Sequence, residues 1–142
     1  MRRILLVVAA LVLLAPSTGA GARRLTIVKA HGSNYGRVLF DGRGHVLYAF
    51  TRDPRRRSVC AGACARAWPP FSVRGTLVAT NGARGALLGT TRRADGRLQA
   101  TYAGRPLYFY VGDRRPGQIL CQNASEFGGL WLVVRPSGRL VR

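Results

Sequence analysis

The residues with the clearest chemical potential lie in a short aromatic and acidic motif that the chain uses twice. The two copies follow the spacing Y-x-[FY]-x-x-D and end 60 positions apart (113 − 53): Tyr48, Phe50 and Asp53, then Tyr108, Tyr110 and Asp113. Two carboxylates brought together by a repeated fold could bind a cation or act as an acid–base pair. An aspartate just past a strand can instead accept backbone N–H bonds in the following turn, and both aspartates precede a proline closely. We favour the turn role.

The two rings of each motif stand at positions i and i+2, which places them on one face of a strand. Exposed, they would form a flat platform for a planar or sugar ligand. In a domain of this size such rings are more commonly buried, with the tyrosine hydroxyls hydrogen-bonded. We therefore expect the four rings to belong to the core.

Three cysteines offer a disulfide, a redox pair or metal ligands. A zinc site requires four nitrogen or sulfur ligands, and only His31 and His45 could supplement the thiols. The C-x-x-x-C spacing is unusual for a zinc knuckle and differs from the C-x-x-C of thioredoxin-like pairs. We predict a structural disulfide between Cys60 and Cys64, with Cys121 as a free thiol that could instead capture one of the pair. The metal alternative would use Cys60, Cys64, Cys121 and His45.

The disulfide closes a very short loop, so its predicted contribution is local. It would fix the segment that presents Trp68, Pro69 and Pro70. The sequence has no G-x-S-x-G, H-E-x-x-H or P-loop motif, and five carboxylates with two histidines leave little material for acid–base chemistry. We expect no enzymatic activity, no cofactor and no metal.

The N-terminus has the pattern of a secretory signal peptide over residues 1–22. Arg2 and Arg3 precede an apolar run that is too short for the ~20 residues of a membrane span. Small residues follow, which predicts cleavage near Ala20–Ala22 and no transmembrane span in the mature chain. No cysteine lies near this point, so we expect a secreted or envelope protein without a lipid anchor.

The formal charge is +18, and removal of Arg2 and Arg3 would lower it by two, to +16. Of the 23 basic residues only Lys29 is a lysine, a bias that also fits GC-rich coding. The arginines are scattered, with one tight cluster at residues 55–57, and no basic helix or aromatic-basic module appears. We expect weak nonspecific attraction to polyanions and no specific nucleic-acid recognition.

Several β-strands must position these groups. A β-branched run at 25–28 predicts a first strand, and Asp-Gly and Gly residues at 41–44 predict a hairpin between 37–40 and 45–50. Residues 46–50 place apolar side chains on both faces of the strand, which indicates a strand covered on both sides. Residues 72–86 are rich in glycine and small residues and are expected to be a linker.

The second half repeats the pattern, with strands expected at 97–102 and 105–111, an apolar strand at 129–134 and a short last strand at 139–141. No segment of the mature chain has a long helical period. The sequence thus predicts an all-β fold: one small domain over 23–142, built from two tandem β-hairpin repeats packed as a sandwich or barrel-like unit with little helix. Repeat one would span about 25–71 and repeat two about 87–142.

These features together resemble a family of secreted repeats, many of them predicted bacterial lipoproteins, that is defined by a Y-x-[FWY]-x-x-D motif. The resemblance rests on the two motifs and on these further segments: Cys60-x-x-x-Cys64 followed by Trp68-Pro69-Pro70, Gly104-Arg105-Pro106-Leu107-Tyr108, and Gly128-Gly129-Leu130-Trp131. It implies a small extracytoplasmic β-domain whose biochemical role is not established.

We therefore expect a non-enzymatic domain that binds or scaffolds an unknown component of the cell envelope. The alternative is an extracytoplasmic redox or metal-handling accessory protein that uses the cysteines.

Overall fold

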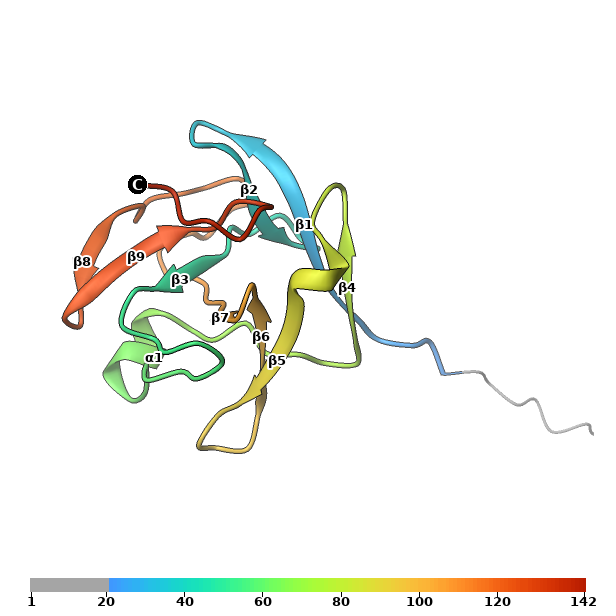
Figure 1. Cartoon of the computed structure of the whole chain (residues 1–142), viewed down its shortest axis with the longest axis horizontal. Helices are drawn as coiled ribbons and strands as arrows, with labels where there is room; N and C mark the ends of the chain where they lie inside the picture. Colours follow the sequence, from blue (N-terminus) through green and yellow to red (C-terminus); the bar gives the residue numbers. More distant parts are fainter. Residues whose placement is uncertain (1–20) are drawn as a thin grey trace, which may run out of the picture.

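The computed structural model describes residues 21–142, so the expected signal segment up to Ala20 lies outside the described residues. Within them the chain forms nine strands, one short α-helix and one 3-10 turn (Figure 1). The strands are β1 (Leu25–Ser33), β2 (Gly36–Asp41), β3 (Tyr48–Phe50), β4 (Thr76–Thr80), β5 (Leu88–Arg92), β6 (Leu98–Tyr102), β7 (Arg105–Pro106), β8 (Ala124–Glu126) and β9 (Gly129–Val133). The helix α1 covers Ala63–Ala67 and the turn η1 covers Gly85–Leu87. The predicted all-β class with little helix is confirmed.

The strands form three small sheets, in the orders β2-β1-β4, β3-β9-β8 and β5-β6-β7. Strand β4 lies inside the segment 72–86 that was expected to be a linker, and it pairs in parallel with β1. At Gly75 the chain enters β4 so close to β1 that a Cβ would lie 2.1 Å from the carbonyl oxygen of Arg24. Only glycine fits such an approach, which explains a glycine that the sequence pattern presented as a sign of loop structure.

The predicted hairpin around residues 41–44 forms, but its second arm soon leaves its partner. The Leu47 N–H donates to the Leu39 carbonyl at 2.9 Å, and β3 then pairs with β9 instead of β2. Alternate side chains of this segment enter two different core clusters: Val46, Tyr48 and Phe50 one, Leu47 and Ala49 the other. The prediction of a strand covered on both faces is confirmed.

The last segment of each repeat completes the sheet of the other repeat. In the first half Ala49 of β3 pairs with Leu132 of β9, and the Leu39 N–H donates to the Val134 carbonyl at 2.9 Å. In the second half the corresponding bonds run back to the first repeat. They join Phe109 N–H to Pro69 O at 2.8 Å and Ala100 N–H to Phe71 O at 2.9 Å.

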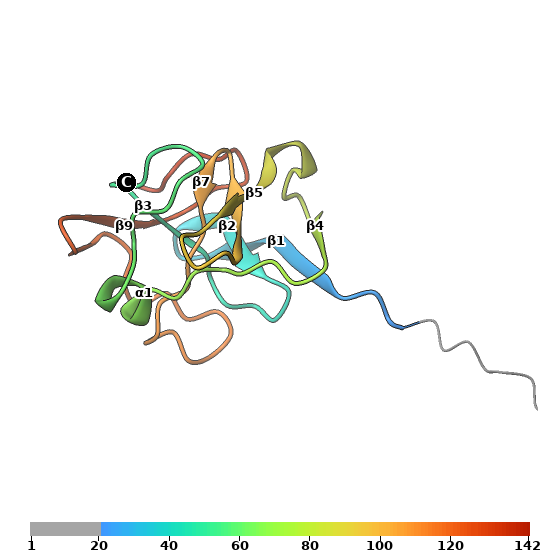
Figure 2. The ribbon, with the colours of Figure 1, turned by 90° about the horizontal axis from the view of Figure 1, so that it is seen from below.

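The two repeats are therefore interlocked, with the C-terminal β9 lying beside β3 in Figures 1 and 2. Strand β8 was not expected: it forms over Ala124–Glu126 as the outer partner of β9. Between residues 21 and 142 no helix has the length and apolar character needed to cross a bilayer.

Candidate functional site

The two motif tyrosines meet at the centre of the domain. Tyr48 and Tyr108 form an antiparallel bridge in which each backbone N–H donates to the other residue's carbonyl, both at 2.9 Å. An exchanged pair of this kind places an approximate twofold axis between the repeats. Both side chains are fully buried.

Each tyrosine hydroxyl binds the aspartate of the opposite motif. Tyr48 donates to Asp113 Oδ2 at 2.7 Å, and Tyr108 donates to Asp53 Oδ2 at 2.6 Å. These hydrogen bonds cross between repeats, so the spacing within one motif does not reveal the partner. Together they hold the two motifs against each other.

The second oxygen of each carboxylate organises the loop that follows it. Asp53 Oδ1 accepts the Val59 N–H at 2.8 Å, and Asp113 Oδ1 accepts the Leu120 N–H at 2.9 Å. The expected turn role is therefore present but incomplete, since each aspartate also accepts a hydroxyl from the other repeat. The sequence around each aspartate indicates the bond to the turn backbone, but it contains nothing that indicates the bond to the tyrosine of the other repeat.

The aromatic rings form one continuous stack through the centre. Phe50 lies 4.2 Å from Trp131, Trp131 lies 4.1 Å from Trp68 with an interplanar angle of 4°, and Trp68 lies 4.8 Å from Tyr110. The motif tyrosines contact this stack edge-on: Tyr48 lies 5.2 Å from Trp68, and Tyr108 lies 5.1 Å from Trp131.

Offset and edge-to-face pairs at these distances are favourable beyond the area they bury. Trp68 is thus a central core residue. Pro69 and Pro70 run beside the second motif, and Tyr110, at the end of the stack, is half-buried.

Burial sets the protonation of this centre. It raises the pKa of Tyr48 and Tyr108 far above the usual range, and the nearby carboxylates act in the same direction. Burial also raises the pKa of Asp53 and Asp113, although the tyrosine and backbone hydrogen bonds oppose the shift. The hydroxyls are therefore fixed as hydrogen-bond donors and are poorly suited to act as nucleophiles or bases.

The two tryptophans differ at their indole nitrogens. Trp68 Nε1 donates to Glu126 Oε2 at 2.7 Å, a contact supplied by the unexpected strand β8. Trp131 Nε1 is buried, and none of the described residues accepts a hydrogen bond from it. The symmetry of the ring stack does not extend to its polar contacts.

The predicted disulfide between Cys60 and Cys64 is confirmed, with a Cα–Cα distance of 5.3 Å. Both cysteines are buried against the cluster that contains the ring stack. Cys64 lies in α1, whose last turn leads into Trp68 through the bond from Trp68 N–H to Cys64 O at 2.8 Å. The disulfide therefore fixes the approach of this tryptophan to the stack.

Cys121 is a half-buried free thiol whose pKa is raised, mainly by burial. It directly follows Leu120, the residue bound by Asp113, just as Cys60 follows Val59, the residue bound by Asp53. Cys121 is therefore the counterpart of Cys60 in the second repeat, which contains no partner cysteine. This equivalence was missed from the sequence because the second loop is one residue longer.

The alternative metal set is not assembled by the described part of the chain. Cys60 and Cys64 are bonded to each other, and His45 lies with Nδ1 3.3 Å from the Asp113 carbonyl oxygen. Over residues 21–142 no group of three or more His, Cys, Asp or Glu side chains is placed to hold an ion. The fold does not bring these predicted ligands together, although their side chains share metal-binding chemistry: Cys60, Cys64, Cys121 and His45.

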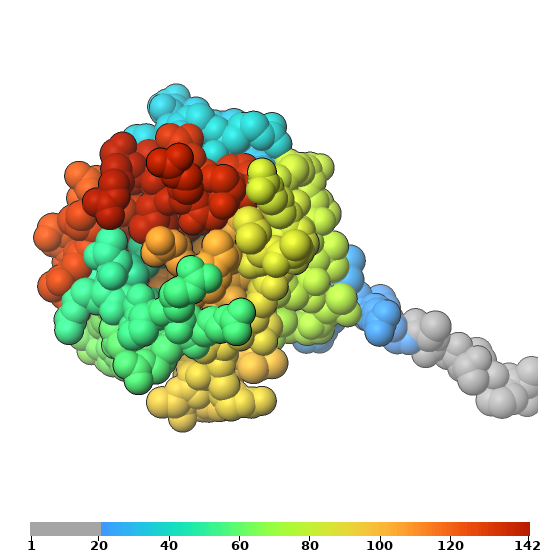
Figure 3. Space-filling model, in the orientation of Figure 1, coloured from blue at the N-terminus to red at the C-terminus, as the bar shows by residue number. Residues whose placement is uncertain are grey.

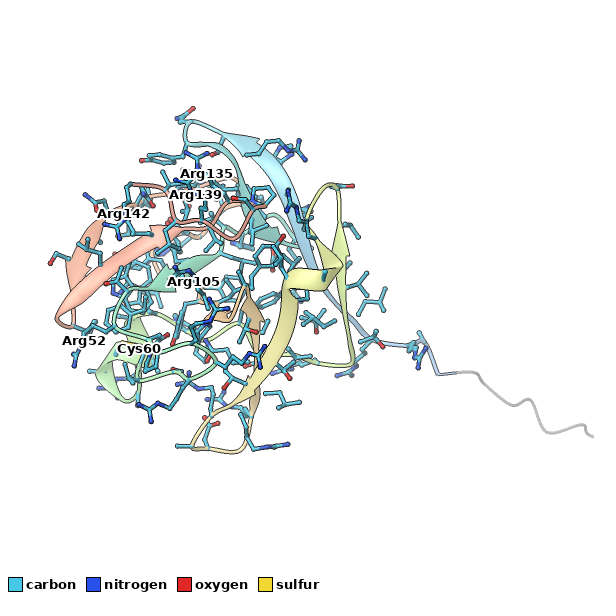
Figure 4. The ribbon with its side chains drawn as sticks, in the orientation of Figure 1. Arg52, Cys60, Arg105, Arg135, Arg139 and Arg142 are labelled. Atoms are coloured by element: carbon cyan, nitrogen blue, oxygen red, sulfur yellow. A yellow bond between two sulfur atoms is a disulfide. The ribbon has the colours of Figure 1, made fainter. Side chains whose placement is uncertain are left out.

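A cationic pocket lies on another part of the molecule and was missed from the sequence. It has a volume of about 540 Å³ and is lined by Arg105, Arg135, Ser137, Arg139, Leu140 and Arg142. Figure 4 labels its four arginines, and Figure 3 shows the red C-terminal segment on the same face as the orange region near β7. Three arginines among the last eight residues could have indicated a basic cluster there, but Arg105 comes from a distant part of the sequence.

One protein family matches this chain, and no curated protein and no solved structure does. The family is described as a secreted repeat of unknown function, and its model matches twice, at residues 29–72 and 89–135. The two matches correspond to the halves whose end segments are exchanged. The chain accordingly belongs to this family of secreted repeats and carries two copies of the repeat.

Proposed function

We propose that the protein is a non-enzymatic binding module of the cell envelope. In this proposal the interlocked repeats are a rigid scaffold, and the basic surface attaches that scaffold to an anionic envelope component. The observation that carries the proposal is that the motif's reactive groups are occupied with one another: both tyrosine hydroxyls and both aspartates are used in the crossed pairs. Contacts with a partner are then left to the outer surface.

The charge distribution supports an anionic partner. The described residues contain a single salt bridge, between Arg97 and Asp95. With 23 basic and 5 acidic residues in the sequence, most of the positive charge has no internal counter-charge. A surface of this kind attracts polyanions over distances of about a Debye length, ~8–10 Å at physiological salt.

A salt titration of binding tests this function. Purified secreted protein would be mixed with isolated envelopes at ionic strengths from 50 to 500 mM and recovered by sedimentation, with neutral phosphatidylcholine vesicles as the control. We expect retention by the envelopes at low salt, a steep loss as salt rises, and no retention by the neutral vesicles. Absence of retention at low salt would contradict the proposal.

A further inference from the structure

Two tight turns form the walls of the cationic pocket. One is the C-terminal hairpin, closed by bonds from Arg135 N–H to Arg139 O and from Gly138 N–H to Arg135 O, both at 2.8 Å. The other is the turn that precedes Arg105, where Ala103 and Gly104 both have positive φ. The turns are pressed together: a Cβ on Gly138 would lie 2.5 Å from the Cβ of Ala103.

A buried tyrosine also joins the two walls. Tyr102, at the end of β6, donates its hydroxyl to the Pro136 carbonyl at 2.7 Å and accepts the Arg84 N–H at 2.7 Å. Arg105, Arg135 and Arg139 therefore project from a fixed framework. Arg142 directly follows Val141, whose N–H donates to the Val133 carbonyl at 3.0 Å. Pre-organised charges of this kind bind an ion at lower entropic cost.

The pocket arginines have almost no partners within the protein. The side chains of Arg105, Arg139 and Arg142 make no hydrogen bond to any described residue, and Arg135 makes only a long one, 3.3 Å, to the Tyr35 carbonyl. No Asp or Glu side chain lines the pocket. Arg135 and Arg139 also face each other across the hairpin, where like charges are destabilising. An anion held between them would relieve this repulsion.

The arginine-rich composition alone does not explain this arrangement. A second, larger pocket of about 800 Å³ is also lined by arginines, including Arg43, Arg74 and Arg97. Asp41 belongs to its lining, however, and Arg97 is paired with Asp95 at 2.6 Å. The arginines of the first pocket are thus clustered without acidic partners, whereas those of the second pocket have carboxylates nearby.

We propose that the pocket formed by Arg105, Arg135, Arg139 and Arg142 binds phosphate groups of an anionic ligand, an inference that rests on the proposed envelope-binding function. Guanidinium groups present paired donors that match phosphate oxygens, and charge-assisted bonds are the strong ones. Four arginines with no acidic side chain among them suit a ligand with several negative charges better than a lone carboxylate. Either a phospholipid headgroup or a soluble phosphate polymer has this chemistry.

Two triple variants of the full chain test the site. The site variant carries Arg105→Gln, Arg139→Gln and Arg142→Gln. The control variant carries Arg43→Gln, Arg74→Gln and Arg114→Gln, which remove the same charge elsewhere. Binding would be measured by calorimetry with inorganic polyphosphate, with vesicles containing phosphatidylglycerol, and with polyglutamate as a carboxylate polymer. Circular dichroism and thermal unfolding would establish that each variant folds.

We expect the site variant to lose at least about 100-fold in affinity for a phosphate ligand, since one charge-assisted bond is worth about tenfold. Its salt dependence should fall by about one unit of slope for each phosphate contact removed. The control variant should lose less than about fivefold, because its charges act only through the screened long-range field. A response to vesicles alone identifies a lipid headgroup, and a response to polyphosphate identifies a soluble phosphate polymer.

Equal losses in the two variants would overturn the site while leaving the proposed function standing. Equally tight, site-dependent binding of polyglutamate would overturn the choice of phosphate. If the unmodified chain bound no polyanion at low salt, the proposed function would fail together with the site.

Discussion

The loops that follow the two motif aspartates begin alike and then diverge. Each aspartate binds a backbone N–H six or seven residues later, Val59 in one loop and Leu120 in the other. A cysteine comes next in both. In the first loop Cys60 is bonded to Cys64 four residues on, and in the second Cys121 stays free.

This difference shows which features the two repeats have in common and which differ between them. The crossed tyrosine–aspartate bonds agree within 0.1 Å, and the two tryptophans stack almost parallel. The loops around them differ in length, in disulfide content and in their contacts to the indole nitrogens. We infer that the interlocked centre carries the stability of the domain and that the loops contribute locally.

The largest effect should come from breaking the shared centre. Trp68→Ala and Trp131→Ala each remove a fully buried ring from the stack, and such truncations cost about 3–5 kcal/mol. We expect losses of similar size at the two sites, measured as the free energy of unfolding in urea, because both rings are fully buried in the same stack. Phe127→Ala, at an exposed ring, is the control and should cost little. A loss below about 1 kcal/mol at either tryptophan would contradict the shared centre.

The sequence predicts this centre in part. Repeated spacing indicated two similar units, apolar alternation indicated a doubly covered strand, and the short cysteine spacing indicated the disulfide. The crossed pairing of Tyr48 with Asp113 was not predictable locally, because its partners lie 65 positions apart and nothing in one motif marks the other as its neighbour. The cationic pocket could not be predicted from the sequence for the same reason. The fold brings Arg105 to the C-terminal hairpin, and each segment alone resembles an ordinary basic surface.

The pH dependence of stability should be the second-largest effect. Burial raises the folded-state pKa of Asp53 and Asp113, so the folded protein binds more protons than the unfolded chain between the ordinary and the raised values. Stability from these groups is fully present below the unfolded pKa of about 3.9 and is lost as pH rises through the folded pKa. Urea unfolding at a series of pH values should therefore show greater stability on acidification across this window.

Two variants sharpen this prediction. Replacing both buried acids, with Asp53→Asn and Asp113→Asn, should flatten the profile. Asp95→Asn is the matched control, because Asp95 is exposed and its neighbour Arg97 lowers its pKa, which gives the opposite sign. The assigned burial would be contradicted if the free energy of unfolding of the unmodified protein fell on acidification and the double variant had the same profile.

The smallest effect on stability is expected at the divergent loop. Cys121→Ser should change the free energy of unfolding by less than about 0.5 kcal/mol, since the thiol is half-buried and unpaired. Thiol titration of the unmodified protein should find one group before reduction and three after. The native thiol should react slowly near neutral pH because burial raises its pKa and so lowers the thiolate fraction. Two or more reactive groups without reductant would refute the distinction between the loops.

A double-mutant cycle on the crossed pair tests the central claim most directly. The cycle combines Tyr108→Phe with Asp53→Ala, and the reference cycle combines Tyr48→Phe with Asp53→Ala, whose two residues belong to the same motif. Interlocked repeats predict a coupling of about 1–2 kcal/mol between Tyr108 and Asp53 and additivity within about 0.5 kcal/mol for Tyr48 and Asp53. Coupling within the motif and none between the repeats would contradict the account.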